Sequence, residues 1–420
     1  MEADGAGFRP YHTRGYKLPV SGWTLRGYSR AMERSGFWLV EPGIVLDAGL
    51  DLPFQCASPA AVLVTHGHID HMNALPMLAR HAPTPGQGPQ RPLQILAPRP
   101  IVHRLRAMVQ LSFAAKVDFQ EPVPREYAEP PVGEALAPAG SALCATGREL
   151  VVWRPVEEGT VLELQGGRKG ALALSVRAVR LVHRCTTLGY VVSSAAHTAR
   201  VLRPDLRGAS KEETAALAKA ARARGEDTLV DEARPERPLV AYLTDTTAAA
   251  LAIPQTAAAV DECPVLVIEC TYLDRSLEEE ALRRGHICWH QLLPHVLARA
   301  RAGPPATWVL IHLSLRHSSQ DARAFFADPA RCGAAFAGKG AREEDGKAGA
   351  EGSEAGPGTA PDLVLWLDNG PWELWLTGAG AADGAGARAA GAEDGGAGVA
   401  STGPQAGAAA VCSPCCDNGS

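Results

Sequence analysis

Short apolar runs alternate with amphipathic helical patterns along most of the chain. A hairpin is predicted at residues 37–46, and a buried strand predicted at 61–65 runs directly into His66. After a loop rich in Pro and Gly, a strand at 93–96 precedes a helix near 101–115 that carries its apolar side chains on one face. This succession of strand, helix and strand is typical of an α/β fold that contains a parallel sheet with helices outside it.

The pattern changes in the middle of the chain. Residues 148–193 predict several antiparallel strands separated by Gly-rich turns. Residues 198–237 are charged and rich in helix-forming residues but lack a strong apolar stripe, so we interpret them as an arm that protrudes from the domain. Further strands are predicted at 239–243, 265–268 and 308–313, and helices at about 277–299 and 319–326.

Two segments near the carboxyl end differ from the rest in composition. Residues 337–361 and 378–420 contain too few large apolar side chains to order themselves, so we predict a disordered insert and a low-complexity disordered tail. Between them, two apolar runs flank Asn369-Gly370, a dipeptide typical of a hairpin turn. We therefore expect one folded domain over residues 1–336, closed by a hairpin at 362–377.

Composition narrows the functional classes. With 41 Lys and Arg against 46 Asp and Glu, the net charge is −5, which excludes a protein that coats nucleic acid through charge excess, so any RNA contact must be local. No stretch approaches the roughly 18–20 apolar residues of a membrane span, and the first ten residues lack the apolar core of a secretory signal. We expect a soluble, intracellular protein with no membrane partner.

The 10 cysteines are irregularly spaced, so reduced thiols are expected. We interpret the pair of Cys412 and Cys415 in the tail as a chance spacing and not as a metal or redox site.

The most informative segment is His66-x-His68-x-Asp70-His71, directly after the buried strand. His66 and His68 point the same way in an extended turn, whereas the adjacent Asp70 and His71 must diverge as a helix begins. One ion cannot easily bind all four side chains. The spacing therefore favours two neighbouring metal ions, each with two ligands from this segment and others from later strand ends. The alternative is a set of buried histidines that are merely hydrogen-bonded to backbone carbonyls.

Three further residues follow predicted strands. His183, Asp245 and His312 each lie where a strand meets a loop. Each alone would more often be a packed or surface residue, but three such positions in one chain favour ligands. Asp245 is short and anionic, so it is suited to bridging two cations, and a pocket rich in imidazole with few carboxylates favours zinc over magnesium or calcium.

These residues resemble the metallo-β-lactamase superfamily, and within it the short ribonuclease Z family of tRNA 3′-processing endonucleases. The likeness covers residues 61–320 and the closing hairpin. Beyond the histidine motif, it is carried by the segments 182–191 (VHRCTTLGYV), 267–272 (VIECTY), 285–288 (GHIC) and 311–317 (IHLSLRH). The resemblance implies a four-layer αββα sandwich of metallo-β-lactamase type, with residues 1–336 forming a metallo-hydrolase domain.

The resemblance also implies the site. Two Zn²⁺ ions per chain would be bound, the first by His66, His68 and His183, the second by Asp70, His71 and His312, with Asp245 bridging them. A hydroxide between the ions, oriented by Asp70, would attack the phosphodiester, and His286, polarised by Glu269, would donate a proton to the leaving oxygen. The implied activity is removal of 3′ trailers from precursor tRNA by a homodimeric endoribonuclease. From the residues alone, His286 and His290 are equally compatible with one amphipathic face of a helix.

The chain also departs from the family pattern. The Phe-Leu-Gly-Thr strand and the Pro-x-Lys-x-Arg-Asn loop of the family have no clean counterpart in residues 15–37, and the Gly-His-Ser-Thr loop keeps only its Gly and His. A hydrolase of a small phosphodiester or thioester therefore stays open as a second hypothesis. A non-enzymatic scaffold is the third, although no ligand is lost. The cations of the arm predict either a local basic surface or a solvated helix in which Glu212 and Glu213 are interleaved with them. These cations are Arg200, Arg203, Arg207, Lys211, Lys219, Arg222 and Arg224.

Overall fold

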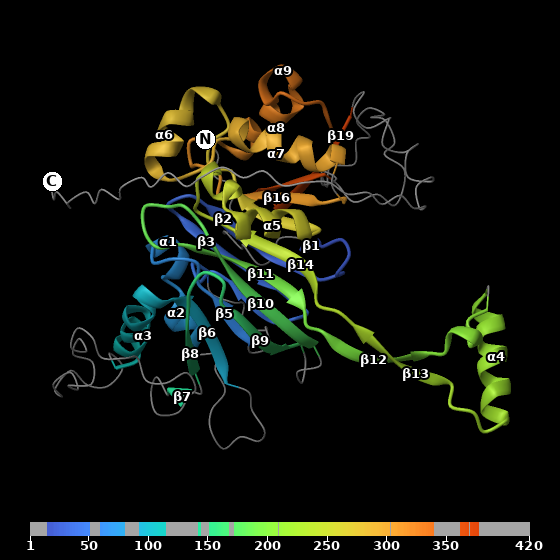
Figure 1. The fold of residues 1–420 in the computed structure, drawn as a ribbon. Helices are drawn as coiled ribbons and strands as arrows, with labels where there is room; N and C mark the ends of the chain where they lie inside the picture. Colours follow the sequence, from blue (N-terminus) through green and yellow to red (C-terminus); the bar gives the residue numbers. More distant parts are fainter. Residues whose placement is uncertain are drawn as a thin grey trace, which may run out of the picture.

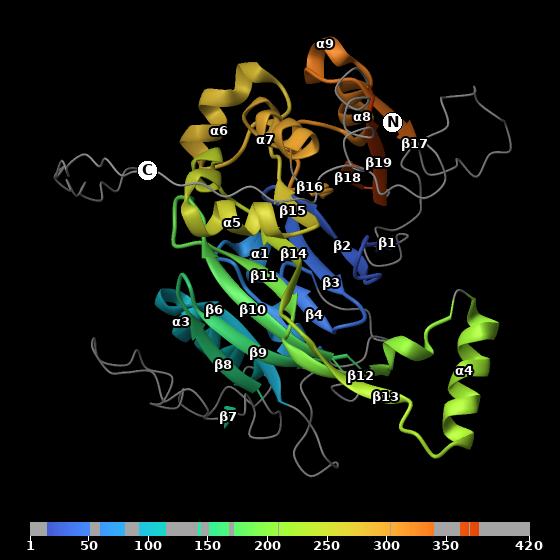
Figure 2. The same cartoon turned by 45° about the vertical axis from the view of Figure 1, so that its right-hand side comes forward.

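The computed structural model describes residues 15–50, 59–79, 92–114, 142–143, 151–167, 172–208, 210–302, 304–339, 362–368 and 370–377. In this part of the chain, two β-sheets pack face to face and helices cover both outer faces (Figures 1 and 2). The four-layer αββα arrangement predicted from the sequence is confirmed. The predicted tail at 378–420, with Cys412 and Cys415, lies outside the described residues, as do residues 340–361 of the predicted insert.

The first sheet has eight strands in the order β1-β2-β3-β4-β5-β6-β8-β7. Strands β1 to β4 pair antiparallel, and β4, β5, β6 and β8 form a parallel run. The hairpin predicted at 37–46 is the β3–β4 pair. The strands are β1 Tyr16–Lys17, β2 Thr24–Arg30, β3 Arg34–Leu39, β4 Ile44–Leu46, β5 Ala61–Leu63, β6 Leu93–Pro98, β7 Ala142–Leu143 and β8 Val151–Val156.

The second sheet has nine strands in the order β17-β19-β18-β16-β15-β14-β11-β10-β9. Its centre, β14-β15-β16-β18, is parallel, and antiparallel strands flank it on both sides. The predicted closing hairpin is the β18–β19 pair. The strands are β9 Val161–Gly166, β10 Leu172–Arg180, β11 Leu188–Ser194, β14 Arg237–Leu243, β15 Val265–Glu269, β16 Thr307–Ile311, β17 Phe336–Lys339, β18 Leu363–Leu367 and β19 Gly370–Leu376.

Helices form the two outer layers. Helices α1 (Ile69–Met72), α2 (Leu75–Ala79) and α3 (Arg99–Ala114) lie on the first sheet. The second sheet carries α5 (Pro254–Glu262), α7 (Trp289–Ala302) and α8 (Ser319–Ala327). The remaining helical segments are α4 Lys211–Ala223, α6 Glu278–Arg284, α9 Pro329–Cys332, and the 3₁₀ turns η3 Pro204–Leu206, η4 Ala248–Ala252 and η5 Arg275–Leu277. No helix in the described part of the chain combines the length and the apolar character needed to cross a lipid bilayer.

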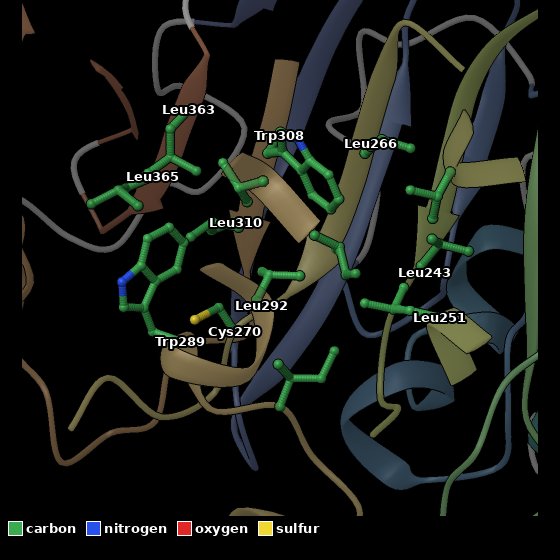
Figure 3. Close-up of a cluster of buried hydrophobic side chains, with 14 of the residues drawn as sticks. Leu243, Leu251, Leu266, Cys270, Trp289, Leu292, Trp308, Leu310, Leu363 and Leu365 are labelled. Carbon is green, nitrogen blue, oxygen red and sulfur yellow. The ribbon is translucent and has the colours of Figure 1, made fainter. Parts of the chain in front are cut away.

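Alternation along the central strands explains the layers. Val267 and Val309 face the first sheet, whereas Leu266 and Trp308 on the same strands face the helices. Figure 3 shows this outer cluster, which includes Leu310 of β16 and Leu292 of α7. Because both faces of these strands are buried, their sequences are continuous apolar runs, as expected for a parallel sheet covered on both sides.

Three elements differ from the sequence prediction. Strand β8 was expected among antiparallel strands, but it pairs parallel with β6 in the first sheet. The single helix predicted at 277–299 is two helices, because Gly285 ends α6 in a left-handed conformation with φ 80°. His286 therefore lies in a loop and His290 on α7, and they do not share a helix face. The predicted insert boundary at 337 falls inside β17, which pairs with β19.

The predicted arm is a distinct extension of the second sheet. Strands β12 (His197–Leu202) and β13 (Leu229–Arg234) form a separate antiparallel ribbon, and α4 lies near its tip, away from the sandwich (Figure 1). The arm was expected to be largely helical, but its stem is extended. Residues 198–202 (TARVL) of β12 and 229–230 (LV) of β13 contain the β-branched residues Thr and Val, which favour a strand over a helix.

Candidate metal centre

The ends of the parallel strands place the candidate ligands at one edge of the sandwich. His66 follows β5, Asp245 follows β14 and His312 follows β16, while His183 lies in the turn between β10 and β11. Since the carboxyl ends of parallel strands meet at the same edge, residues separated by more than 200 positions come together there. Asp245 and His312 adopt positive φ angles of 49° and 63°. Such backbone strain costs about 1–3 kcal/mol per residue and is typical of functional sites.

One group of ligand atoms comes from three imidazoles and Asp245. The Nε2 atom of His183 lies 3.3 Å from Nδ1 of His68 and 3.9 Å from Oδ2 of Asp245. His66 Nε2 is 3.6 Å from the same Asp245 oxygen. Zinc with bonds of roughly 2.0–2.1 Å in tetrahedral geometry separates its ligand atoms by roughly 3.3 Å. These three distances, from 3.3 to 3.9 Å, lie at or somewhat above that value.

A second group faces the other oxygen of Asp245. Oδ1 of Asp245 lies 3.2 Å from His71 Nε2 and 3.3 Å from His312 Nε2, and these two nitrogens are 3.3 Å apart. Oδ2 of Asp70 is 3.6 Å from His71 Nε2 and 3.7 Å from His312 Nε2. Because its two oxygens point to different groups, Asp245 is placed to bridge two ions.

The chemistry of the donors fits two cations. His66 is fully buried, and its Nε2 atom has no hydrogen-bond partner, which is rare for a buried polar atom and is explained by a metal ion. Burial lowers the pKa of His66, His68 and His183, and the neighbouring imidazoles lower it further. These imidazoles are therefore neutral at physiological pH, which is the form that binds metal.

Opposite charges stabilise the second group in the absence of metal. Burial lowers the pKa of His71, but the Asp245 and Asp47 carboxylates outweigh this and raise it well above its usual value. Burial raises the pKa of Asp70 and Asp245, but the adjacent His71 and His312 more than reverse this. A bound cation would replace the proton on His71 in balancing these carboxylates.

The second nitrogen of each of four imidazoles meets a protein oxygen. His71 Nδ1 lies 2.8 Å from Asp47, His66 Nδ1 3.0 Å from Thr65 Oγ1, and His183 Nδ1 2.7 Å from the Gly285 carbonyl. His312 Nδ1 lies 3.0 Å from Thr271 Oγ1. Such contacts fix the ring orientation and the tautomer of metal-binding histidines. The sequence analysis predicted none of these four partners in this role.

Glu269, which is buried, and His286, which is partly buried, form a pair beside the two groups. His286 Nδ1 is 3.1 and 3.2 Å from the two Glu269 oxygens, and these oxygens also accept hydrogen bonds from backbone amides, including that of Ile287 at 3.2 Å. Burial lowers the pKa of His286, but the Glu269 carboxylate outweighs it and raises the pKa to about 9. The His286 ring centroid is 5.1 Å from that of His183 and 5.3 Å from that of His312. His286 is therefore an imidazolium at neutral pH, next to both ligand groups.

The structure thus brings together all of the predicted site residues: His66, His68, Asp70, His71, His183, Asp245, Glu269, His286 and His312. His290 is not among them, because its ring packs against Phe325 on the helical layer, with centroids 6.3 Å apart.

Comparison with known protein families finds a match for one part of the chain. Residues 38–134 match the model of the metallo-beta-lactamase superfamily. This segment of the chain is therefore similar to the metallo-β-lactamase superfamily. The matched segment includes the His66 to His71 motif, and the αββα sandwich around it is the metallo-β-lactamase fold predicted from the sequence. The segments that carry the ribonuclease Z resemblance lie outside the match.

Solved structures similar to the chain are distant from it. They include the metallo-beta-lactamase fold protein YhfI from Bacillus subtilis, with 10% identity, a TM-score of 0.36 and coverage of 71% of this chain and 88% of that one. Zn(2+)-bound PqqB from Methylobacterium extorquens has 14% identity, a TM-score of 0.34 and coverage of 69% and 76%. Unliganded yeast PDE1 has 11% identity, a TM-score of 0.31 and coverage of 60% and 57%. No curated protein matches the chain.

Proposed function

We propose that the protein is a zinc-dependent phosphodiesterase, and specifically an endoribonuclease that removes 3′ trailers from precursor tRNA. The observation that carries the hydrolase part is the pair of ligand groups that share Asp245, beside the charged Glu269–His286 pair. The tRNA part depends on the resemblance of segments 182–191, 267–272, 285–288 and 311–317 to ribonuclease Z. The homodimer that the resemblance implies belongs to the same proposal, and sedimentation of the purified protein tests it.

The two groups would bind one zinc ion each, with Asp245 between them. When bound, two zinc ions lower the pKa of water towards neutrality and stabilise negative charge that develops on a phosphate group. The ligands include only the carboxylates of Asp70 and Asp245, so two divalent ions leave the pocket with net positive charge. Such a pocket attracts an anionic substrate.

The protein itself supplies the proton for the leaving oxygen. Nδ1 of His286 faces Glu269, so its Nε2 is the nitrogen left to donate. With a pKa of about 9, the ring is protonated at neutral pH and can act as a general acid. Glu269 has two functions, because it raises this pKa and holds the ring in one orientation through its contacts with Thr271 Oγ1 and the backbone.

Cleavage of a defined precursor tests the proposal. Zinc-loaded protein incubated with a tRNA that carries a 3′ trailer should release one discrete trailer, and a tRNA without a trailer is the matched control. Turnover of small phosphodiesters without any trailer release would contradict the tRNA part. Absence of both activities in protein that has bound zinc would contradict the hydrolase proposal as a whole.

The role of His286 is tested by the leaving group. His286→Ala should retain zinc and lose roughly 10²- to 10⁴-fold in rate on an RNA substrate, as expected for removal of a general acid. A p-nitrophenyl phosphodiester has a leaving group that needs no proton, so its hydrolysis should change much less. An equal loss on both substrates, or loss of zinc, would show that His286 serves the metal centre and not the leaving oxygen.

A hydrolase of a small phosphodiester or thioester is the second candidate, and the charge of the arm favours it. Arg200 lies 2.9 Å from Asp227, Arg203 2.7 Å from Asp205, and Arg224 2.6 Å from Glu226. Arg207 lies 3.6 Å from Glu232. Ion pairing within the arm neutralises much of the basic surface that could bind RNA, in line with the solvated-face interpretation of the sequence.

A further inference from the structure

A thiol lies beside the first ligand group and has no role in the proposed mechanism. Cys185 follows His183 by two residues in the turn between β10 and β11. Its Sγ atom is 3.9 Å from Nε2 of His68. Among the cysteines that the structure describes, Cys185 is exposed, whereas Cys263, Cys270, Cys288 and Cys332 are buried. Within the described part of the chain, Cys185 is therefore the thiol that both faces solvent and borders the metal centre.

The ligand atoms around Cys185 form one compact group. His66, His68, His183 and Cys185 each present a donor atom, and all four atoms lie within 4.8 Å of one another. Thiolate and imidazole occur together as zinc ligands in proteins, and a zinc ion can expand from four ligands to five.

The unpartnered nitrogen of His66 points to a ligand at the same place. His66 Nε2 belongs to this group, is fully buried and has no hydrogen-bond partner. A buried nitrogen in that state indicates an ion at the centre of the group. Cys185 lies at the solvent-exposed border of this centre, with its sulfur within 4.8 Å of the other three donor atoms.

We propose that Cys185 is a further ligand of the first metal ion, which is then held by His66, His68, His183 and the Cys185 thiolate in addition to the Asp245 bridge. On binding, a sulfur–metal bond forms and the thiol proton passes to solvent. Because thiolate is a soft ligand, the first site should favour zinc or cadmium over manganese or magnesium, whereas the second site offers only nitrogen and oxygen.

The competing role for the thiol is a hydrogen-bond partner. The four other imidazoles of the centre each direct their second nitrogen to an oxygen, and Cys185 Sγ is in the corresponding position for His68. In that role, the sulfur orients His68 but does not touch the ion. Only direct ligation produces a sulfur–metal electronic transition, so the two roles are spectroscopically distinct.

Absorption spectra of the full-length chain test the proposal. The metal-free protein is titrated with Co²⁺ or Cd²⁺, and a near-ultraviolet thiolate-to-metal charge-transfer band should grow with the first equivalent. The band should be lost in Cys185→Ser and retained in Cys332→Ala, which removes a buried thiol on α9 as a matched control. Loading without a band in the native chain, or an unchanged band in Cys185→Ser, would overturn the proposal.

Affinity and alkylation give a second readout. Cys185→Ser should weaken binding of the first Cd²⁺ by on the order of 10–100-fold and change Mn²⁺ binding little. Iodoacetamide should label Cys185 in the metal-free chain and not in the loaded chain, as read by mass spectrometry of the peptide. Protection without a charge-transfer band would assign the hydrogen-bonding role and contradict ligation. None of these measurements needs substrate, so failure of the catalytic proposal leaves this result intact.

Discussion

At the residue scale, Asp47 organises the second ligand group although it is not a ligand itself. Its carboxylate accepts hydrogen bonds from the Thr65 amide at 2.8 Å and from the Tyr242 hydroxyl at 3.0 Å, and it lies 2.8 Å from His71 Nδ1. These contacts join β4, β5 and β14 beneath the centre. They also leave His71 Nε2 as the nitrogen that faces Asp245, 3.2 Å away.

Replacement of the Asp47 carboxylate should selectively weaken binding of the second metal ion. We expect Asp47→Asn to lower affinity for the second ion by about 10–100-fold, because outer partners of metal-binding histidines typically contribute that much. Competition with a chelator during zinc titration measures the two sites separately. Tyr242→Phe is the graded control, since it removes one hydrogen bond to Asp47 and leaves the charge. Equal zinc retention by Asp47→Asn and the native chain would contradict this role.

The pair of Glu269 and His286 predicts an alkaline limit to activity. The donating form of His286 is the protonated one, so its contribution to the rate should be complete below its pKa and be lost as pH rises through about 9. Glu269→Gln removes the carboxylate that raises this pKa most, so the lowering by burial is no longer outweighed and the fall should move to a lower pH. Profiles of kcat against pH on an RNA substrate measure the shift.

A p-nitrophenyl phosphodiester is the control for this profile, because its leaving group needs no proton and the alkaline fall should be absent. An identical alkaline limb in Glu269→Gln and the native chain would show that another group titrates there.

Individual residues differ in how well the sequence could reveal them. His66, His68, Asp70 and His71 lie within six positions, so their spacing alone indicates a metal site. Asp47 contacts His71 across 24 positions, and a lone Asp after an apolar run carries no such signal. What distinguishes Asp47 is its positive φ of 58° and complete burial, which only the folded chain shows.

At the element scale, the end of α6 positions a ligand as well as ending a helix. Gly285 caps α6 with φ 80°, and its carbonyl lies 2.7 Å from His183 Nδ1. A Cβ atom at this position would meet that same nitrogen at 2.7 Å. The close approach of backbone and imidazole therefore requires glycine for both conformation and space.

Two glycines with similar backbone angles separate these effects. Gly225 has φ 75°, and the Cβ atom of an alanine there would have no neighbour within 4 Å, so Gly225→Ala should cost only the roughly 1–2 kcal/mol of a left-handed alanine. Gly285→Ala should have the same conformational cost and should also displace His183, which weakens binding of the first zinc ion. Thermal unfolding of the metal-free variants and zinc titration measure the two effects. Equal zinc affinity in both variants would contradict the positioning role of Gly285.

The same element shows where periodicity fails. Apolar spacing continues across residues 277–299, which predicts one helix, but a single Gly in the left-handed conformation interrupts it and places His286 in a loop. Strand β8 illustrates a different difficulty. Its apolar residues identify a strand, but the sheet it joins depends on pairing with β6, more than 50 positions earlier.

At the scale of the whole molecule, the two halves of the centre come from opposing sheets. The motif after β5 belongs to the first sheet, and Asp245 and His312 belong to the second. The inner core, which includes Phe37 and Tyr242 with ring centroids 6.3 Å apart, holds the sheets together beneath the site. The layer order followed from the sequence through family resemblance, because the alternation of elements alone establishes an α/β class but not the pairing of two sheets.

The arm is attached in a way that allows its removal. Strands β11 and β14 are antiparallel neighbours, and Ser194 pairs with Arg237 at the point where the ribbon leaves the sheet. An Asn-Gly turn in place of residues 195–236 therefore joins two strands that are already paired, with a loop length suited to a hairpin. The arm joins the end of β11 to the start of β14, whereas His183 and Asp245 lie at the opposite ends of these two strands. The metal centre should therefore be unaffected, which zinc titration of the shortened chain verifies.

Removal of the arm separates the two candidate functions. If the substrate is precursor tRNA, the shortened chain should hydrolyse a p-nitrophenyl phosphodiester at the native rate but lose at least about 10-fold in kcat/KM for trailer removal, since a lost exosite contact of about 1.4 kcal/mol has that effect. The salt dependence of tRNA cleavage should also become shallower as arm cations are lost. Unchanged trailer removal would show that RNA does not bind the arm. If neither chain cleaves tRNA but both hydrolyse the phosphodiester, a small-ester hydrolase is the better assignment, in line with the pairing of four arm arginines with carboxylates of the arm.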